Sequence, residues 1–399
     1  MRIAFFTPIS PIKSAISDYS EGLAVAFAHS PDVSTLHIFT SGTYEAENPV
    51  IREKLTILPH TAFNHADYDV TVYALGDNAQ FHEYMLSYIY RYPGVVILHD
   101  LTLHRLILTT TVGRQNPKAY IDQLAYAYDA DAAHIAQYVN TEVNNEVLLK
   151  YPLFERIVDS SLGTIVHNHY ARNQILLKRP SALVQTIVSP FFLPPGFPPA
   201  EPSAIRKQQR ASLKLDADDF VVGSFGIFVP NKHLHACLAA FKEVAQQKQN
   251  AHYLLCGFAA DGYDLAGEIR QMGLENQVHL TGWQPPTAFV RNMFALDVGI
   301  HLRYPHIGGT PYTPIRLMGL GIATITSDIE PLQELPQGTC LKIAPDDYAE
   351  AMLTALLNQL ALDDSFRSLV AENGRSFIQQ HHQLNAIARQ YVQFFQSIV

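Results

Sequence analysis

Short apolar runs alternate with amphipathic segments along the first half of the chain. Arg2–Thr7 is a continuous apolar run typical of a buried parallel strand, and a helical pattern follows at Ile16–Phe27. This alternation predicts a doubly wound parallel sheet, in which ligands bind at the carboxyl ends of the strands. The other strand-like runs of this half are Leu36–Thr40, Val70–Ala74, Val95–His99, Thr164–His167 and Leu183–Val188.

A proline-rich segment, Ser189–Pro202, divides the chain. It holds six prolines in fourteen residues, and proline fixes φ and removes an N–H donor, which excludes a helix or a central strand. We therefore expect a domain at 1–188, a hinge at 189–202, a second α/β domain at 203–380 and a separate C-terminal helix within 381–399. The strand-like runs of the second series are Phe220–Phe225, Tyr253–Cys256, Val278–Thr281, Val298–Leu302, Ile322–Thr326 and Cys340–Ile343.

Composition narrows the class of protein. The length of 399 residues favours two domains, and 48% hydrophobic with 16% charged residues supports large cores. A formal net charge of −9 argues against general nucleic-acid binding, and three scattered cysteines indicate neither a disulfide framework nor a zinc site. The apolar runs are too short for a signal peptide or a spanning helix, so we expect a cytoplasmic protein.

The segment Asp297–Asp328 gives the clearest sign of a binding site. An apolar strand runs into a Gly-rich loop, a helix begins near Pro314, and a second strand follows. Free N–H groups at such a helix start can hold a phosphate or a sugar. Thr313 directly before Pro314 is the expected N-cap, with the proline at the first helical position.

Five stretches, in order and spacing, resemble one group within glycosyltransferase family 4. They are Pro8–Tyr19 (PISPIKSAISDY), Gly76–His82 (GDNAQFH), Pro93–Leu106 (PGVVILHDLTLHRL), Gly223–Lys232 (GSFGIFVPNK) and Leu302–Pro305 with the Gly-rich loop after it. The resemblance implies a GT-B architecture, with two Rossmann-like domains facing each other across a cleft. It also implies a retaining enzyme, independent of metal ions and cofactors, that moves a sugar from a nucleotide sugar to an acceptor. In this architecture the last helix, Leu384–Phe395, packs back on the N-terminal domain.

The resemblance places catalytic and acceptor residues in the N-terminal domain. His99 would lie beside the reacting sugar, and Asp100 would either orient its imidazole or cap the next helix. The loop that ends at Ser14, with Ala15, Ser17 and Asp18, would face the diphosphate or the acceptor. Ala15 replaces a glycine common in the family. An ordinary N-cap at Ser14 or Ser17 is the structural alternative.

The donor would bind the C-terminal domain. Lys232 would neutralise the diphosphate, although Ile227 stands where the family often has an arginine; Arg303 or Arg316 would then meet the remaining charge. Trp283, within Gly282–Pro285, would stack on the base. The other donor-binding candidates are Gly308, Gly309, Thr310, Thr313 and Glu334.

The chain departs from the family at its acidic pair. Gly309 and Arg316 occupy the positions of two glutamates, and the relatives nearest in motif keep the first acid. Three interpretations stay open: backbone groups alone bind the donor, the donor is unusual, or turnover is lost. The alternative function is a weakly active or inactive glycosyltransferase-like subunit that partners an active enzyme. A sugar-nucleotide epimerase is disfavoured, because those enzymes also need acidic residues in the cleft.

The expected partner is a nucleotide sugar. The resemblance leaves the acceptor open among a saccharide, a lipid-linked and a protein acceptor, and it leaves open a contact with a membrane surface or a partner enzyme. Neither the sugar nor the nucleotide follows from the sequence.

Overall fold

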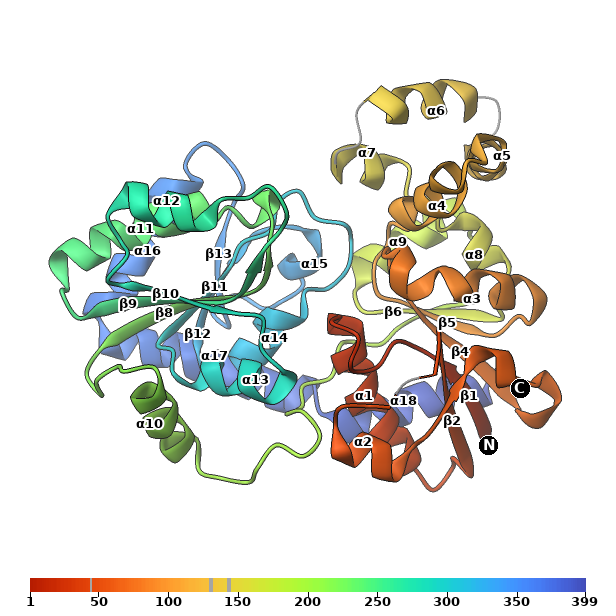
Figure 1. Ribbon diagram of the computed structural model, residues 1–399, viewed down its shortest axis with the longest axis horizontal. Coiled ribbons are helices and arrows are strands. Elements are labelled where there is room, and N and C mark those ends of the chain that lie inside the picture. The colour runs from red at the N-terminus through yellow and green to blue at the C-terminus, as the bar shows by residue number, and fades with distance from the viewer. Residues whose placement is uncertain (44, 129–131, 142–144) are drawn as a thin grey trace. The chain divides into compact units, whose positions relative to one another are not determined.

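The computed structural model describes residues 1–43, 45–128, 132–141 and 145–399 (Figure 1). The chain forms two compact units. Unit 1 comprises Met1–Pro190, Pro305–Thr310 and Leu384–Val399, and unit 2 comprises Phe191–Tyr304 and Pro311–Gln383. Each unit is a parallel α/β domain, which confirms the predicted fold class.

Unit 1 is built on a parallel sheet. The described residues form seven strands of it, in the order β3-β2-β1-β4-β5-β6-β7. The central strands are wholly buried, which explains why they read as unbroken apolar runs. The strands are β1 (Arg2–Phe6), β2 (Thr35–Thr40), β3 (Thr56–Pro59), β4 (Val70–Leu75), β5 (Val95–Leu98), β6 (Gly163–Val166) and β7 (Val184–Thr186). The helices are α1 (Ala15–Ala28), α2 (Pro49–Lys54), α3 (Ala79–Arg91), α4 (His104–Thr111), α5 (Pro117–Tyr128), α6 (Ala132–Thr141), α7 (Asn145–Lys150), α8 (Glu155–Asp159), α9 (His169–Lys178) and α18 (Leu384–Gln396).

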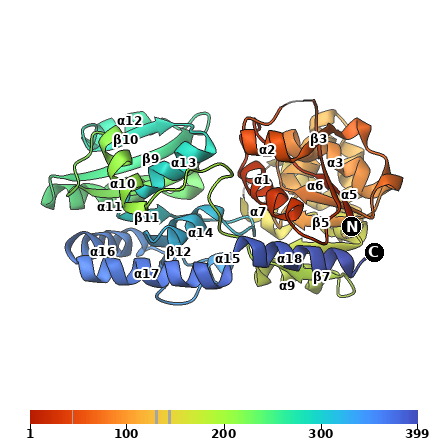
Figure 2. The same cartoon turned by 90° about the horizontal axis from the view of Figure 1, so that it is seen from below.

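The last helix, α18, is part of unit 1 and packs beside α1 (Figure 2). Tyr391 and Phe395 are fully buried against Phe27, and burying an aromatic side chain of this size contributes about 1.5–3 kcal/mol. The Tyr391 hydroxyl lies 2.7 Å from the Tyr19 hydroxyl. A Cβ on Gly163 at the start of β6 would overlap the α18 side chains, so this glycine permits their close approach.

Unit 2 has a second parallel sheet, in the order β10-β9-β8-β11-β12-β13 among the described strands. The longest pairing joins β8 and β9 in register from Phe220 and Ala251 to Phe228 and Ala259. The strands are β8 (Phe220–Phe228), β9 (Ala251–Ala259), β10 (Val278–Gly282), β11 (Val298–His301), β12 (Ala323–Ser327) and β13 (Leu341–Ile343). The helices are α10 (Pro202–Ser212), α11 (Leu234–Gln247), α12 (Leu265–Met272), α13 (Pro286–Phe294), α14 (Tyr312–Gly319), α15 (Glu330–Gln333), α16 (Ala349–Leu362) and α17 (Asp364–His381).

The largest differences between the unit boundaries and the expected domain limits lie in two segments. Most of the proline-rich segment belongs to unit 2, where Phe191 N donates to the His382 carbonyl at 2.7 Å. The six residues Pro305–Thr310, expected in the donor domain, belong to unit 1. None of the described helices is long and apolar enough to cross a membrane.

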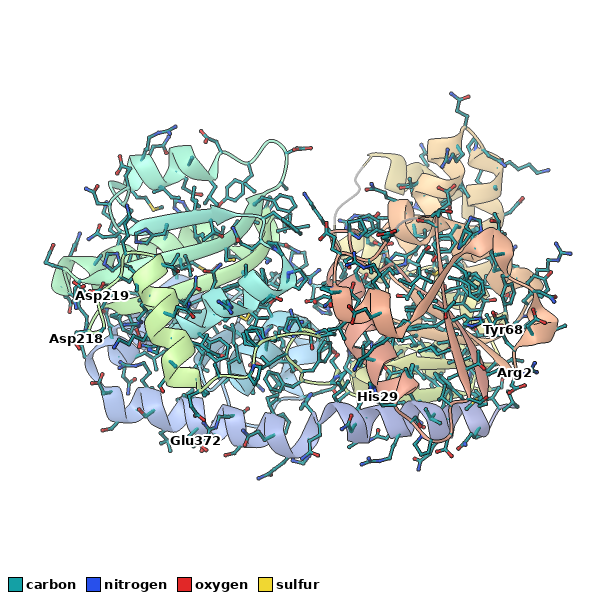
Figure 3. All side chains as sticks on the ribbon, turned by 60° about the horizontal axis from the view of Figure 1, so that its bottom comes forward. Arg2, His29, Tyr68, Asp218, Asp219 and Glu372 are labelled. Carbon is teal, nitrogen blue, oxygen red and sulfur yellow. The ribbon has the colours of Figure 1, made fainter. Side chains whose placement is uncertain are left out.

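Charged residues lie at the amino ends of the strands, away from the candidate site residues. Arg2 at the start of β1 lies at the same end of unit 1 as Tyr68 (Figure 3). Arg2 forms an exposed ion pair of 2.7 Å with Asp69, which the solvent screens. Asp218 and Asp219 directly precede β8 in unit 2 (Figure 3). The candidate site residues gather instead at the carboxyl ends.

Candidate functional site

Two histidines meet at the carboxyl edge of the unit 1 sheet. His99 follows β5 and His167 follows β6, and these strands are parallel neighbours. His167 Nε2 lies 3.2 Å from His99 Nδ1, with the ring centroids 4.9 Å apart. Tyr19 of α1 meets His99 edge-on at 4.8 Å. The structure therefore builds the predicted His99 into an aromatic cluster with two residues that were not predicted.

Burial keeps this cluster electrically neutral. Desolvation lowers the pKa of His99 well below its usual range, and the neighbouring imidazoles of His167 and His82 act in the same direction. Desolvation also lowers the pKa of His167 to about 4. At neutral pH both rings are therefore uncharged. The Nε2 atom of His99 is buried and has no hydrogen-bond partner within the described parts of the chain.

Asp100 is tied to the loop after β4. Its Oδ2 accepts the Asp77 N–H at 3.0 Å, and Asp77 Oδ1 in turn accepts from Leu106 N at 3.0 Å in the first turn of α4. One of the two roles expected for Asp100 was to cap the next helix. Asp77 takes this role instead, because it accepts the N–H in the first turn of α4. Burial raises the pKa of Asp77 to about 7, and the negative charge of Asp100 contributes to this rise.

The Gly-rich loop Pro305–Thr310 is bound to the same edge of unit 1. Asn168 Nδ2 donates to the Gly308 carbonyl at 3.2 Å and to Thr310 Oγ1 at 2.9 Å. Thr310 Oγ1 donates to the His167 carbonyl at 3.3 Å, and Thr102 N to the Ile307 carbonyl at 3.4 Å. The structure thus brings Gly308, Gly309 and Thr310 together with His99.

Both glycines of this loop are required by their surroundings. Gly308 has φ +77°, a conformation that favours glycine, and an added Cβ would lie 2.5 Å from Leu101 Cβ. A Cβ on Gly309 would overlap the His99 carbonyl oxygen and lie 3.1 Å from Asp100 Oδ1. The missing glutamate is therefore not a simple deletion, because backbone and a carboxylate occupy the space that its side chain would enter.

The loop before α1 has the expected cap. Ser14 Oγ accepts from Ile16 N at 3.2 Å, and Ala15 is the first helical residue. Ser17 is buried, with no described partner for its Oγ, and Asp18 is half-buried. Sequence reasoning missed Glu21, which is buried on the same helix and accepts Ser10 N at 2.8 Å; desolvation raises its pKa.

In unit 2, cationic groups crowd at the carboxyl ends of β8 and β11. Lys232 Nζ donates to the Phe225 carbonyl at 2.6 Å. Desolvation, followed by the positive charge of Arg303, lowers the pKa of Lys232 to about 7. His301 at the end of β11 is buried, and its pKa falls well below the usual range because of desolvation, Lys232 and Arg303. The structure thus groups the predicted Lys232 and Arg303 with His301, which the sequence did not reveal.

The remaining donor candidates lie on or near helix starts and ends. The expected N-cap at Thr313 is wrong: α14 begins at Tyr312, Pro311 stands at the N-cap and Pro314 is the third helical residue. Arg316 is buried, with its guanidinium 4.4 Å from the Tyr312 ring centroid and 5.9 Å from that of Phe192. Glu334 is exposed at the C-cap of α15.

The described side chains lie in residues 1–43, 45–128, 132–141 and 145–399. Within those ranges no group of three or more His, Cys, Asp or Glu side chains is placed to hold a metal ion.

Comparisons with known proteins agree with this architecture. Residues 205–377 match the family model described as glycosyl transferases group 1. Curated protein sequences give no match.

Among solved structures, the chain is similar over its full length to Anabaena HepE in complex with UDP and glucose. The TM-score is 0.67, the identity 19%, and 100% of each chain is covered. It is also similar to sucrose-phosphate synthase from Thermosynechococcus elongatus, with a TM-score of 0.68, 17% identity and coverage of 100% of this chain and 99% of that one. The chain is also similar to WaaG, a glycosyltransferase involved in lipopolysaccharide biosynthesis. The TM-score is 0.64, the identity 12%, and the match covers 98% of this chain and 99% of that one. The matched domain and the shared fold together support a transferase enzyme of the glycosyltransferase class.

Proposed function

We propose that the protein is a retaining GT-B glycosyltransferase of family 4 that transfers a sugar from a nucleotide sugar to an acceptor. The observation that carries the proposal is the cluster formed by the two basic side chains Lys232 and Arg303 with the neutral imidazole of His301. Burial and the positive charge of Arg303 hold the pKa of Lys232 near 7. The negative charge around this lysine is therefore too weak to offset these two effects. A diphosphate supplies that charge, and Anabaena HepE is known in complexes with UDP and UDP-glucose.

An apolar surface next to this group is suited to the base of the nucleotide. Ile227 and Phe258 are register partners at the ends of β8 and β9 and are 46% and 41% exposed. Trp283, 37% exposed, directly follows β10, the neighbour of β9. Exposed aromatic faces at strand ends favour stacking by a planar base. In this proposal Ile227 contributes apolar contact where the family often has an arginine.

The proposed mechanism concentrates electrostatic stabilisation on the leaving diphosphate. Protonated Lys232 and Arg303 oppose the charge that develops as the glycosidic C–O bond breaks. The acceptor hydroxyl attacks from the face on which the diphosphate departs, and a phosphate oxygen takes its proton, so the configuration is retained. This chemistry needs neither a metal ion nor a carboxylate pair. Unit 1 contributes the acceptor site through His99 and the loop before α1.

A second candidate is a glycosyltransferase-like subunit without turnover that partners an active enzyme. The observation in its favour is Gly309, whose surroundings exclude the acid that typical members carry. The two candidates share a fold and differ in whether purified protein consumes a nucleotide sugar. Hydrolysis or transfer from any donor, with no second protein added, contradicts the subunit role.

A thermal-shift screen of nucleoside diphosphates and nucleotide sugars tests the proposed site. A ligand at about a hundred times its Kd adds about 2.7 kcal/mol to the free energy of unfolding. Lys232→Ala should then weaken binding of the best nucleoside diphosphate by about 1.5–3 kcal/mol, because a charge-assisted contact is lost. Lys242→Ala, at an exposed lysine of α11, is the matched control and should leave the affinity unchanged.

The free nucleoside distinguishes a phosphate contact from a structural role. It carries no diphosphate, so its affinity should be the same for wild type and Lys232→Ala. Equal weakening of nucleoside and nucleoside diphosphate would show that Lys232 supports the fold and that the diphosphate site lies elsewhere.

A further inference from the structure

A chain of hydrogen bonds runs from the backbone after β7 to His99. His167 Nδ1 lies 3.0 Å from the Ile187 carbonyl oxygen, and His167 Nε2 lies 3.2 Å from His99 Nδ1. A carbonyl oxygen only accepts, so His167 Nδ1 must carry a proton. Because burial keeps His167 neutral, its Nε2 has a free lone pair and accepts the proton of His99 Nδ1. The hydrogen-bond geometry and the neutrality of His167 together fix both tautomers.

The last atom of this hydrogen-bonded series is His99 Nε2, an acceptor that carries no proton. With Nδ1 protonated, neutral His99 carries no proton on Nε2, and that atom is buried without a partner among the residues described. A buried acceptor left unsatisfied destabilises the site, and a ligand can remove this cost only by donating a hydrogen bond. A hydroxyl group meets this requirement. A phosphate oxygen does not, because it would bring a second acceptor, and a negative one, against the lone pair.

We infer that His167 is a positioning residue that holds His99 in the Nδ1–H tautomer, so that His99 Nε2 accepts a hydrogen bond from a substrate hydroxyl. The tautomer follows from the hydrogen-bond geometry and the neutrality of His167, whereas the substrate role rests on the proposed function. The site in unit 1 thereby selects hydroxyl-bearing groups over phosphate. His99 binds and orients a hydroxyl as a neutral acceptor.

The surrounding rings keep this arrangement in place. Tyr19 contacts both imidazoles, with centroid distances of 4.8 Å to His99 and 5.3 Å to His167. Its hydroxyl is fixed by Tyr391 of α18 at 2.7 Å. His82, the other imidazole that acts on His99, is also neutral, since burial lowers its pKa to about 3. Rotation of His99 that would exchange its two nitrogens is therefore opposed by packing on both sides.

Nitrogen-15 NMR of histidine-labelled protein tests the tautomer directly. In neutral imidazole the protonated nitrogen and the bare nitrogen give distinct signals, and His99→Gln assigns those of His99. We expect a protonated Nδ1 and a bare Nε2 in wild type between pH 6 and 8. His167→Leu removes the acceptor and should produce a mixed or Nε2–H tautomer. His167→Gln can accept from His99 and donate to Ile187, and should keep the wild-type signals.

His104→Gln is the matched control, because His104 is equally buried in unit 1 and contacts Tyr120 and the Tyr151 carbonyl instead. It should leave the His99 signals unchanged. For turnover, we expect a loss of about 10- to 100-fold in kcat/KM for His167→Leu, comparable to other residues that orient a functional histidine, and recovery in His167→Gln. An Nε2–H tautomer in wild type, or unchanged His99 signals in His167→Leu, would overturn the inference. The predicted NMR signals without detectable turnover in wild type would leave the tautomer established and contradict the proposed transferase instead.

Discussion

Binding of a nucleoside diphosphate should be coupled to protonation of Lys232. In the free protein the pKa of this lysine is about 7, so at pH 8 about 0.9 of the molecules carry it uncharged. A bound diphosphate replaces lost solvation with an opposite charge and moves the pKa back toward the ordinary value of 10.5. The complex must therefore take up close to one proton at pH 8. Affinity is highest below pH 7 and falls as pH rises through the free-state pKa.

The magnitude follows from the same two pKa values. If the bound-state pKa returns to 10.5, Kd increases about 25-fold between pH 7.5 and pH 9, close to the limit of tenfold per pH unit. The ligand adds little to this slope, since the second ionisation of a phosphate lies near pH 6 and is complete by pH 7.5. His301 does not contribute either, because its pKa lies well below its usual range and it is neutral throughout.

Isothermal titration calorimetry between pH 7.5 and 9 measures both quantities. Repeating each titration in buffers of different ionisation enthalpy gives the number of protons taken up. Lys232→Arg keeps its charge at all these pH values and should bind with a flat pH profile. Lys232→Met should bind weakly, again with a flat profile. A wild-type slope that survives in Lys232→Met would show that another group titrates and would refute this reasoning.

Two further predictions concern the loop Pro305–Thr310. Gly309→Ala should lower the free energy of unfolding of unit 1 by about 1–3 kcal/mol in urea denaturation, because its Cβ meets the His99 carbonyl. Gly113→Ala, whose nearest new contact is 3.7 Å, should change it by no more than about 0.5 kcal/mol; equal effects would show that the loop relaxes freely. Asn168→Asp keeps an acceptor for Ala171 N at the start of α9 but loses its N–H donors to the loop. Hydrogen exchange should therefore accelerate at 306–310 and not in α9, and uniform acceleration would contradict a specific tether.

The sheets were largely predictable, because strands buried on both faces must be apolar throughout. The runs at β1, β4, β5 and β12 are buried along nearly their whole length and were recognised from this pattern. β3 (Thr56–Pro59) was missed: it is an edge strand of four residues that are exposed or half-buried. A strand with one neighbour and partial burial leaves little periodic signal in the sequence.

The site was predictable where it depends on strand ends, and unpredictable where it depends on tertiary contacts. His99 was identified from the resemblance, which matches it to a histidine beside the reacting sugar. His167 also ends an apolar run, Thr164–His167, but it lies outside the stretches that carry the resemblance. The tether between Asn168 and Gly308 joins residues 140 positions apart, and no local pattern reports it. For the same reason the sequence could not show that Pro305–Thr310 belongs to unit 1, since the segments on both sides belong to unit 2.

The surroundings of Gly309 reverse the effect that the sequence predicts for Gly309→Glu. From the sequence, restoring Glu at 309 should supply an acceptor for sugar hydroxyls. In the structure the His99 carbonyl oxygen occupies the position of the new Cβ, and Asp100 Oδ1 lies 3.1 Å away. Gly309→Glu would thus add steric overlap and a second carboxylate beside the first, both unfavourable. We therefore expect Gly309→Glu to weaken donor binding for every nucleotide sugar tested, and improved binding of any of them would show that the loop can open to admit the acid.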